Sequence, residues 1–244
     1  MLKKVLFFGG VLLSLGCARD ISAKIANIPE ASGVDYCSDS NTLVIANDEG
    51  WYYEVSTNGK ILKKHKVKGD LEGVVCEENY FLFAVENKGL LKVNRKTNKK
   101  KLIPIEREYK NKDIKLISKN SGIEGIAKVG EFYYLSKQSK KKKDSLIAIV
   151  KINKNQAKIV DIIKPKIADI AGLTYHNGLL YMVSDKKDLL IKYNLDTKKV
   201  EQRVELPKSA QEGIAFDDKG FFYIADDEGT LLKYTEELLD NHKK

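Results

Sequence analysis

The stretch "DLEGVV" (Asp70–Val75) places a carboxylate directly before a glycine that opens a run of β-branched residues. A similar arrangement returns at "EASGVDY" (30–36), "GIEGIAK" (122–128), "DIAGLTY" (169–175) and "AQEGIAF" (210–216). The five glycines, at positions 33, 73, 125, 172 and 213, are spaced by 40 to 52 residues. Self-similarity at such a period indicates a repeat architecture.

Each unit continues in the same way after its glycine. The second unit runs from "GVVC" through an aromatic-rich segment (81–86) and an apolar segment (89–94) to a more polar one (100–105), with turn residues between them. Four short strands per unit are typical of a β-propeller blade. Five units use nearly the whole chain, and a sixth would leave too few residues for four strands each. The sequence therefore predicts an all-β fold, a five-bladed β-propeller of four-stranded antiparallel blades.

The two ends of the chain complement each other. The last unit stops after its third strand at "LLKYT" (231–235), whereas residues 21–27 resemble a fourth strand that precedes the first unit. We expect residues 21–27 to pair with the last blade and close the ring, which removes an open sheet edge. Residues 17–244 are predicted to form one propeller domain, long enough to bury a single core.

The first residues have the pattern of an export signal. A basic start (Met1–Lys4) and an apolar run precede Cys17, and the run is too short to span a bilayer. The Gly16–Cys17 junction resembles a lipobox, although Ser14 stands where leucine is usual. We predict a lipoprotein-type signal peptide at residues 1–16, with lipid on Cys17 anchoring the protein to a membrane. Ordinary secretion is the alternative. The expected location faces the periplasm, and Ala18 favours the outer over the inner membrane.

The net charge of +9 raises the possibility of a nucleic-acid partner. Lysines are spread along alternating strand segments and arginine is scarce, which favours a solvated basic surface instead. We therefore expect a monomer without a nucleic-acid partner. The run Lys140–Lys143 is expected at an exposed loop tip, and contact with anionic lipid is its alternative interpretation.

Cys37 and Cys76 occupy similar places in consecutive units, three or four residues after the repeat glycine. Outside the cytoplasm such a pair permits a disulfide. Similar places in neighbouring units need not bring two sulfur atoms within bonding distance. The sequence leaves a disulfide and two buried free thiols as alternatives.

In a propeller the first strand of each blade lines the central channel. The register of the repeat then predicts a ring formed by the residues before the glycines: Ser32, Glu72, Glu124, Ala171 and Glu212. Three converging carboxylates repel one another and raise their own pKa values unless a cation joins them. Hard oxygen ligands suit Ca²⁺. We predict a central Ca²⁺ held by Glu72, Glu124 and Glu212, with the Ser32 hydroxyl or a water, and with backbone oxygen or water at Ala171. Carboxylates that merely face a water-filled channel are the alternative.

The second strand of each unit runs antiparallel to the first and ends on the face where the first begins. Its last residues should therefore rim the mouth above the ring, as a polar pocket for a ligand. These predicted rim residues are Asn47, Asp48, Glu86, Lys137, Asp185 and Asp226. Ordinary turn positions are the alternative.

The succession "SGVDY…NTLVIANDE", "DLEGVV…FLFAVEN", "GIEGIA…FYYLSK", "DIAGLTY…LLYMVSDK" and "AQEGIAFDDKGFFYIADDEG" resembles the SdiA-regulated family, the YjiK-like bacterial propellers. The resemblance covers residues 25–235 and implies an exported or membrane-associated propeller. Members usually carry serine where this chain has Ala171. The order of ring residues is also similar, more distantly, to the central calcium site of the calcium-activated nucleotidases (apyrases), where the metal helps hold a nucleotide phosphate.

Two functions follow from these expectations. The first is a binding or scaffold module with a calcium site and an undefined small ligand or protein partner. The second is a calcium-dependent hydrolase acting on a phosphate ester or a lactone at the channel mouth, by a metal-activated water. Serine-hydrolase chemistry is disfavoured because the chain lacks a G-x-S-x-G elbow. Since a fold alone does not define a function, the binding module is the preferred prediction.

Overall fold

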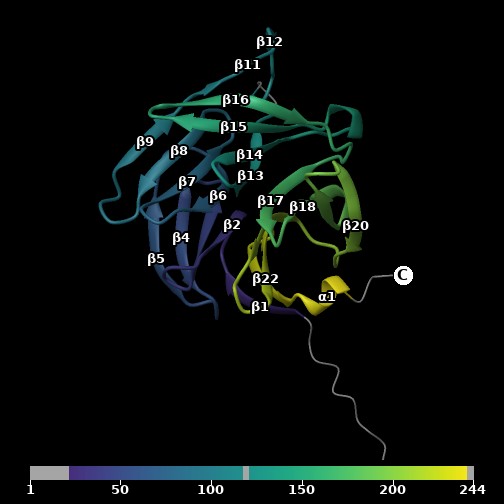
Figure 1. Cartoon of the computed structure of the whole chain (residues 1–244). Coiled ribbons are helices and arrows are strands. Elements are labelled where there is room, and N and C mark those ends of the chain that lie inside the picture. Colours follow the sequence, from purple (N-terminus) through teal and green to yellow (C-terminus); the bar gives the residue numbers. More distant parts are fainter. Residues whose placement is uncertain (1–21, 118–120, 241–244) are drawn as a thin grey trace, which may run out of the picture.

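The computed structural model describes residues 22–117 and 121–240, drawn in colour in Figure 1. The predicted signal segment (1–16) and Cys17 lie outside the described residues. Five sheets surround a common axis, and the labels β2, β6, β13 and β17 lie nearest its centre. The predicted five-bladed propeller is confirmed.

Four blades are built from strands that follow one another along the chain. Blade 1 contains β2 (Ala31–Cys37), β3 (Thr42–Asn47), β4 (Trp51–Ser56) and β5 (Ile61–Lys66). Blade 2 contains β6 (Leu71–Cys76), β7 (Tyr80–Val85), β8 (Gly89–Asn94) and β9 (Lys100–Ile103). Blade 3 contains β13 (Ile123–Val129), β14 (Phe132–Lys137), β15 (Ile147–Asn153) and β16 (Gln156–Ile163). Blade 4 contains β17 (Ile170–His176), β18 (Leu179–Ser184), β19 (Leu189–Asn194) and β20 (Lys199–Glu205).

Blade 5 joins the two ends of the described chain. It contains β21 (Gln211–Phe216), β22 (Phe221–Asp226), β23 (Thr230–Thr235) and, as its outer strand, β1 (Ser22–Asn27). β1 runs antiparallel to β23, with Ser22 opposite Tyr234 and Asn27 opposite Thr230. The predicted closure by the N-terminal strand is confirmed. A short helix, α1 (Glu237–Asp240), follows β23.

The long connection between blades 2 and 3 departs from the expected four-strand pattern. Its strand β10 (Ile105–Glu106) pairs in parallel with β16 and adds a fifth strand to blade 3. The strands β11 (Glu108–Tyr109) and β12 (Lys112–Asp113) form a separate small hairpin. The connection is held in place because the Ala157 N–H donates to the Pro104 carbonyl (2.9 Å) and Leu116 is fully buried. Two-residue strands of this kind carry no periodic signal in the sequence.

The core lies between the blades rather than at the axis. Five clusters of buried apolar side chains form, each from neighbouring blades. The cluster between blades 1 and 2 packs Tyr52 of β4 against Phe81 and Phe83 of β7, with ring centroids 5.6 and 5.2 Å apart. Burial of such aromatic faces is the main contribution that holds one blade against the next.

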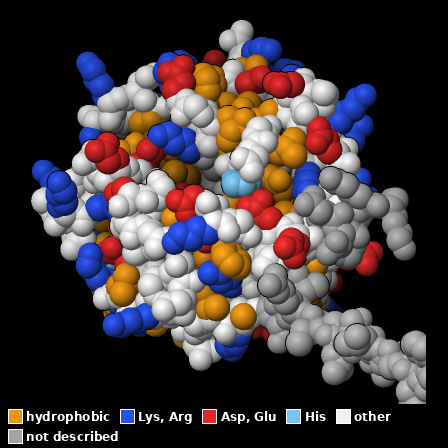
Figure 2. Space-filling view, turned by 60° about the horizontal axis from the view of Figure 1, so that its bottom comes forward, with side chains coloured by type: hydrophobic (Ala, Val, Ile, Leu, Met, Phe, Trp, Pro, Cys, Tyr) orange, Lys and Arg blue, Asp and Glu red, His pale blue; other side chains and the backbone are white. Residues whose placement is uncertain are grey.

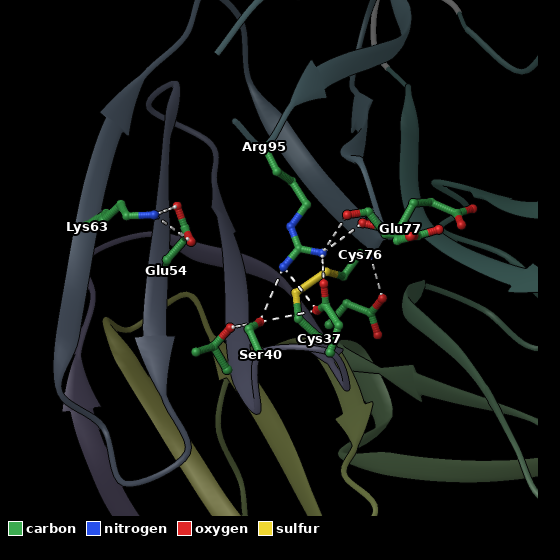
Figure 3. The surroundings of a disulfide bond; sticks show 11 residues. Cys37, Ser40, Glu54, Lys63, Cys76, Glu77 and Arg95 are labelled. Atoms are coloured by element: carbon green, nitrogen blue, oxygen red, sulfur yellow. Dashed lines mark hydrogen bonds and ion pairs between the residues drawn. A yellow bond between two sulfur atoms is a disulfide. The ribbon is translucent and has the colours of Figure 1, made fainter. Parts of the chain in front are cut away.

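A disulfide joins blades 1 and 2 between Cys37 and Cys76, whose Cα atoms are 5.5 Å apart (Figure 3). The question that the sequence left open is therefore answered in favour of the bridge. Next to it, Arg95 donates to both carboxylate oxygens of Asp39 (2.7 and 3.0 Å) and to the carbonyl of Glu77 (3.0 Å). The guanidinium group holds the pKa of Asp39 below its usual value. A covalent bond and an ion pair thus connect the same two blades.

Basic side chains are scattered over the face shown in Figure 2, with acidic and apolar groups between them. In the described part of the chain, no helix has the length and apolar character needed to cross a bilayer. The run Lys140–Lys143 lies in the connection between β14 and β15, and its four side chains are exposed. The expected exposure of this loop is confirmed.

Candidate functional site at the acidic mouth of the channel

Each inner strand carries a β-bulge at the position before its repeat glycine. In blade 1, Ala31 is opposite Asn47 and Gly33 is opposite Ala46, so Ser32 has no partner between them. The same shift in register occurs at the equivalent place in the other four blades. A bulge turns the extra residue out of the regular alternation of the strand. The ring residues Ser32, Glu72, Glu124, Ala171 and Glu212 therefore share one structural position.

The glycine after each bulge allows neighbouring inner strands to approach closely at the axis. A Cβ on Gly73 would lie 2.8 Å from the carbonyl oxygen of Glu124, and a Cβ on Gly125 would lie 2.7 Å from that of Ala171. The five repeat glycines line a cavity of about 10 Å³, which is the space of one water-sized sphere. At this level the axis therefore has room for a water-sized group and not for a larger ligand.

The three ring glutamates are half-buried and lie among other acidic side chains. Burial, followed by the charges of Glu124 and Glu212, raises the pKa of Glu72 to about 9. Burial raises the pKa of Glu124 to about 7 and that of Glu212 to about 8, with neighbouring acids adding to both shifts. Burial and neighbouring negative charge both favour the protonated form of these carboxyl groups. The structure therefore brings the three predicted carboxylates together in a desolvated acidic environment.

The other two ring positions are uncharged. Ser32 is buried, and its hydroxyl donates to the carbonyl of Glu30 (3.2 Å), which leaves its oxygen lone pairs available. Ala171 is buried and offers backbone groups alone. The atoms that these five positions offer as metal ligands are therefore carboxylate, hydroxyl and peptide oxygens, a set that suits a hard cation such as Ca²⁺.

A second ring stands above the first, one residue after the end of each second strand. The backbone N–H of Asp48 donates to the Glu30 carbonyl (3.4 Å), and that of Glu86 donates to the Asp70 carbonyl (3.1 Å). In blades 3 and 5, the backbone N–H of the equivalent residue also donates to the carbonyl of the residue two positions before the ring residue. In blade 4, Ile170 is opposite Ser184, the last residue of its second strand. Asp185, the residue after Ser184, therefore occupies the equivalent position. The members of this second ring are Asp48, Glu86, Gln138, Asp185 and Asp227.

The predicted rim residues divide between this ring and the position before it. Asp48, Glu86 and Asp185 belong to the second ring, whereas Asn47, Lys137 and Asp226 end their strands one residue earlier. Asn47 is buried and donates to the Pro29 carbonyl (2.5 Å). Asp226 is buried and accepts the N–H of Glu228 (2.8 Å). These two side chains hold turns together.

Above the channel, a cavity of about 210 Å³ opens between blades 3, 4 and 5. Its charged and amide-bearing residues are Glu124, Gln138, Asp169, Asp185, Lys186 and Glu212. The cavity is therefore acidic, although the chain as a whole carries a net charge of +9. Lys186 is the basic residue of its lining, and its ammonium group lies 4.0 Å from the Asp169 carboxylate. A cationic or metal-bridged ligand suits such a pocket.

Sequence reasoning missed three acids of the mouth: Glu30, Asp169 and Asp227. The signal was present for two of them, because Glu30 and Asp169 each precede a ring position by two residues, as Asp70 does. Asp227 was missed because its neighbour Asp226 was taken as the rim residue. A side-chain hydrogen bond with Asp227, followed by the charges of Asp227 and Asp48, raises the pKa of Glu30.

The three ring glutamates are not the tightest acidic group of the described chain. One carboxylate oxygen from each of Glu30, Asp48 and Asp227 lies within 4.8 Å of the other two, a spacing that the ring glutamates do not reach. A shared ion on the axis therefore requires the ring glutamates to change rotamer. Three rotatable bonds per side chain provide that freedom.

Fold and mouth together define a class of architecture: a closed five-bladed propeller with a narrow axis and an acidic entrance. The sequence pattern of the SdiA-regulated family matches residues 17–231. The chain belongs to the SdiA-regulated family. No curated protein matches its sequence.

Similarity to solved structures of other proteins supports the fold alone. The glutaminyl cyclase of Myxococcus xanthus is similar with a TM-score of 0.64 at 10% identity, over 88% of this chain and 94% of that one. BamB from Moraxella catarrhalis has a TM-score of 0.43 at 12% identity, over 83% of this chain and 57% of that one. At these identities the cyclase supports a shared architecture and carries no information on chemistry.

Proposed function

We propose that the protein is a calcium-binding propeller that acts as a binding or scaffold module at a membrane. One Ca²⁺ is held on the axis by Glu72, Glu124 and Glu212. The Ser32 hydroxyl or a water completes its coordination, with backbone oxygen or water at Ala171. The ligand of the module binds at the mouth above the ion. Lipid on Cys17 anchors the exported protein so that it faces the periplasm.

The observation that carries this proposal is the raised pKa of all three ring glutamates, which burial causes first and neighbouring acidic groups increase. Their pKa values, about 9, 7 and 8, mean that ionising all three at neutral pH costs free energy unless a cation compensates. Burial and the negative charges of neighbouring acids produce these shifts. A bound divalent ion would supply the missing positive charge and bring the pKa values down.

Calcium fits the donors better than its common competitors. All the candidate ligands are oxygen atoms, whereas zinc sites favour histidine and cysteine. Magnesium demands near-ideal octahedral geometry, which a five-fold ring with one alanine does not offer readily. Calcium tolerates irregular sites of six to eight oxygens and accepts water among them.

A hydrolase that uses histidine as its general base finds no support among the described histidines. The two described histidines lie elsewhere: His65 is within 3.7 Å of Glu54 on β4, and His176 stacks on Phe216 at the far end of β17. His176 is the last residue of β17. A binding role therefore needs fewer additional assumptions than catalysis.

Thermal melting with metal titration tests the calcium site. Ca²⁺ at about a hundred times its dissociation constant should stabilise the protein by roughly 2.7 kcal/mol, since it binds the folded state alone. Mg²⁺ should give a smaller shift. Glu124→Gln should lose most of the calcium response, whereas Glu108→Gln, at an exposed acid of the small hairpin, should keep it. An unchanged melting temperature with calcium would count against the site.

Membrane attachment has its own test. Mass spectrometry of the protein from the membrane fraction should find a diacylglyceryl group on Cys17, and Cys17→Ala should release the protein in soluble form. Recovery of an unmodified protein from the periplasm would leave the propeller as a secreted module without an anchor.

A further inference from the structure

Blade 2 places two lysines directly opposite each other on neighbouring strands. Lys92 of β8 is paired in register with Lys101 of β9. Like charges at such a pair destabilise a sheet. Lys99 precedes Lys101 by two residues, so its side chain leaves the chain on the same face.

The other blades avoid this arrangement at the equivalent position. Blade 1 has Glu54 opposite Lys63, joined by an ion pair of 3.1 Å. Blade 3 has Ile149 opposite Asp161, blade 4 has Lys192 opposite Gln202, and blade 5 has Lys233 opposite Ala23. The pair of cations in blade 2 is therefore a departure from the repeat and calls for a compensating charge.

The two lysines open onto a pocket between blades 2 and 3. The pocket measures about 220 Å³ and is lined by Lys92, Asn94, Thr97, Lys99, Lys101 and Lys154. Lys154 comes from the turn between β15 and β16 of blade 3. Four lysines from two different blades therefore line one space.

Few interactions within the described chain neutralise these four charges. Lys92 lies over the ring of Tyr80, with its ammonium nitrogen 3.6 Å from the centroid, and Lys101 donates to the side-chain oxygen of Asn155. Among the described residues, none of the four takes part in an ion pair within 4.0 Å. Blade 3 also pairs two lysines in register, Lys151 and Lys158, but each of them forms an ion pair, with Glu131 (2.7 Å) and Glu106 (3.1 Å) respectively.

We propose that this pocket binds a phosphate-bearing anion. A phosphate group offers several oxygen acceptors, so it can accept from more than one ammonium group at once. The Asn94–Lys99 turn lies at the end of blade 2 opposite the acidic mouth, because β8 begins near the mouth and runs away from it. Anions are thus attracted to one face of the propeller and cations to the other.

Two sources of the phosphate share this chemistry: a soluble polyphosphate and the headgroup of an anionic lipid. Ser22, the first described residue, pairs with Tyr234 near the end of β23, and that end lies on the same face as the pocket. Titration with pyrophosphate and co-sedimentation with lipid vesicles distinguish the two sources.

Calorimetric titration with pyrophosphate, at low ionic strength and without added calcium, tests the pocket directly. The double variant Lys99→Ala/Lys154→Ala should bind about tenfold more weakly, since two charge-assisted contacts are lost. Lys141→Ala/Lys142→Ala removes the same charge from an exposed connection and should bind as the unaltered protein does. Equal weakening in both double variants would show general charge attraction and overturn the proposal.

Lys92→Glu separates loss of the site from loss of the fold. It recreates in blade 2 the glutamate–lysine pair of blade 1, so the melting temperature without anion should rise while pyrophosphate binding is lost. A lower melting temperature, or binding that survives, would contradict the role of the paired cations.

Binding to lipid vesicles identifies the source of the phosphate group. Co-sedimentation with phosphatidylglycerol vesicles but not with phosphatidylcholine, lost in Lys99→Ala/Lys154→Ala, supports a lipid headgroup. Pyrophosphate binding without vesicle binding supports a soluble anion. Absence of both interactions would overturn the proposal, and none of these outcomes bears on the calcium site.

Discussion

Gly33 of blade 1 lies directly against the carbonyl oxygen of Glu72 in blade 2, so that a Cβ on Gly33 would overlap that oxygen. The same relation continues around the axis, and a Cβ on Gly213 would lie 2.7 Å from the backbone nitrogen of Val34. The position of each ring residue is therefore fixed by the neighbouring blade as well as by its own strand.

Gly33→Ala should destabilise the propeller because backbone atoms cannot yield to the added methyl group. We expect a loss of roughly 1 to 3 kcal/mol in the free energy of unfolding, the usual cost of overpacking. Denaturant unfolding measures it. Gly130→Asn is the control, since Gly130 has φ +59° with nothing near its Cβ position and asparagine tolerates that conformation. Similar losses in both variants would argue against close packing at the axis.

The Cys37–Cys76 bridge should contribute strongly to stability. It spans 39 residues of sequence, for which the chain-entropy relation gives about 4 kcal/mol. Reduction should therefore lower the melting temperature of the protein and leave that of the Cys37→Ala/Cys76→Ala variant unchanged. Finding two free thiols in the folded protein under non-reducing conditions would contradict the bridge.

Removing β1 should open blade 5. A chain that begins at Ser22 should unfold cooperatively, whereas one that begins at Ile28 exposes the edge of β23 and should unfold at lower temperature and aggregate. Circular dichroism melting and size-exclusion chromatography compare the two. Equal stability would mean that the contacts between β1 and β23 contribute little to ring closure.

The ring glutamates predict a pH dependence with a definite sign. Their folded pKa values lie above the ordinary 4.5, so the folded state holds protons that the unfolded state has released. Without calcium, the free energy of unfolding should fall as the pH rises from 4.5 towards 9. Chemical denaturation across this range, with and without chelator, measures the slope.

Calcium affinity should change in the opposite direction over the same range. Because the ion displaces protons from Glu72 and Glu212, its binding should tighten as the pH rises and should release protons at pH 7. Calorimetry in buffers of different ionisation enthalpy detects that release. Binding that is independent of pH would place the ion away from the ring.

The repeat made most of the fold predictable. The glycine and its preceding residue mark the inner strand in every unit, and the ends of the chain revealed the closing strand. The strand β10 was not predictable, because two residues that pair with a blade through a proline-containing connection leave no periodic pattern.

The sequence indicated a polar mouth and three of the second-ring residues, Asp48, Glu86 and Asp185. In blades 3 and 5 it indicated Lys137 and Asp226, whereas the following residues, Gln138 and Asp227, occupy the second-ring position. A shift of one residue along a strand turns a side chain to a different direction. The sequence could not decide between a disulfide and free thiols at Cys37 and Cys76, because similar repeat positions do not fix the distance between two sulfur atoms.

A crystal structure of the protein grown with calcium tests the central claim most directly. We predict an anomalous peak on the propeller axis, with carboxylate oxygens of Glu72, Glu124 and Glu212 at about 2.3 to 2.6 Å from it. An ion bound instead by Glu30, Asp48 and Asp227, or three ring carboxylates turned to bulk solvent around an axis without an ion, would contradict the account.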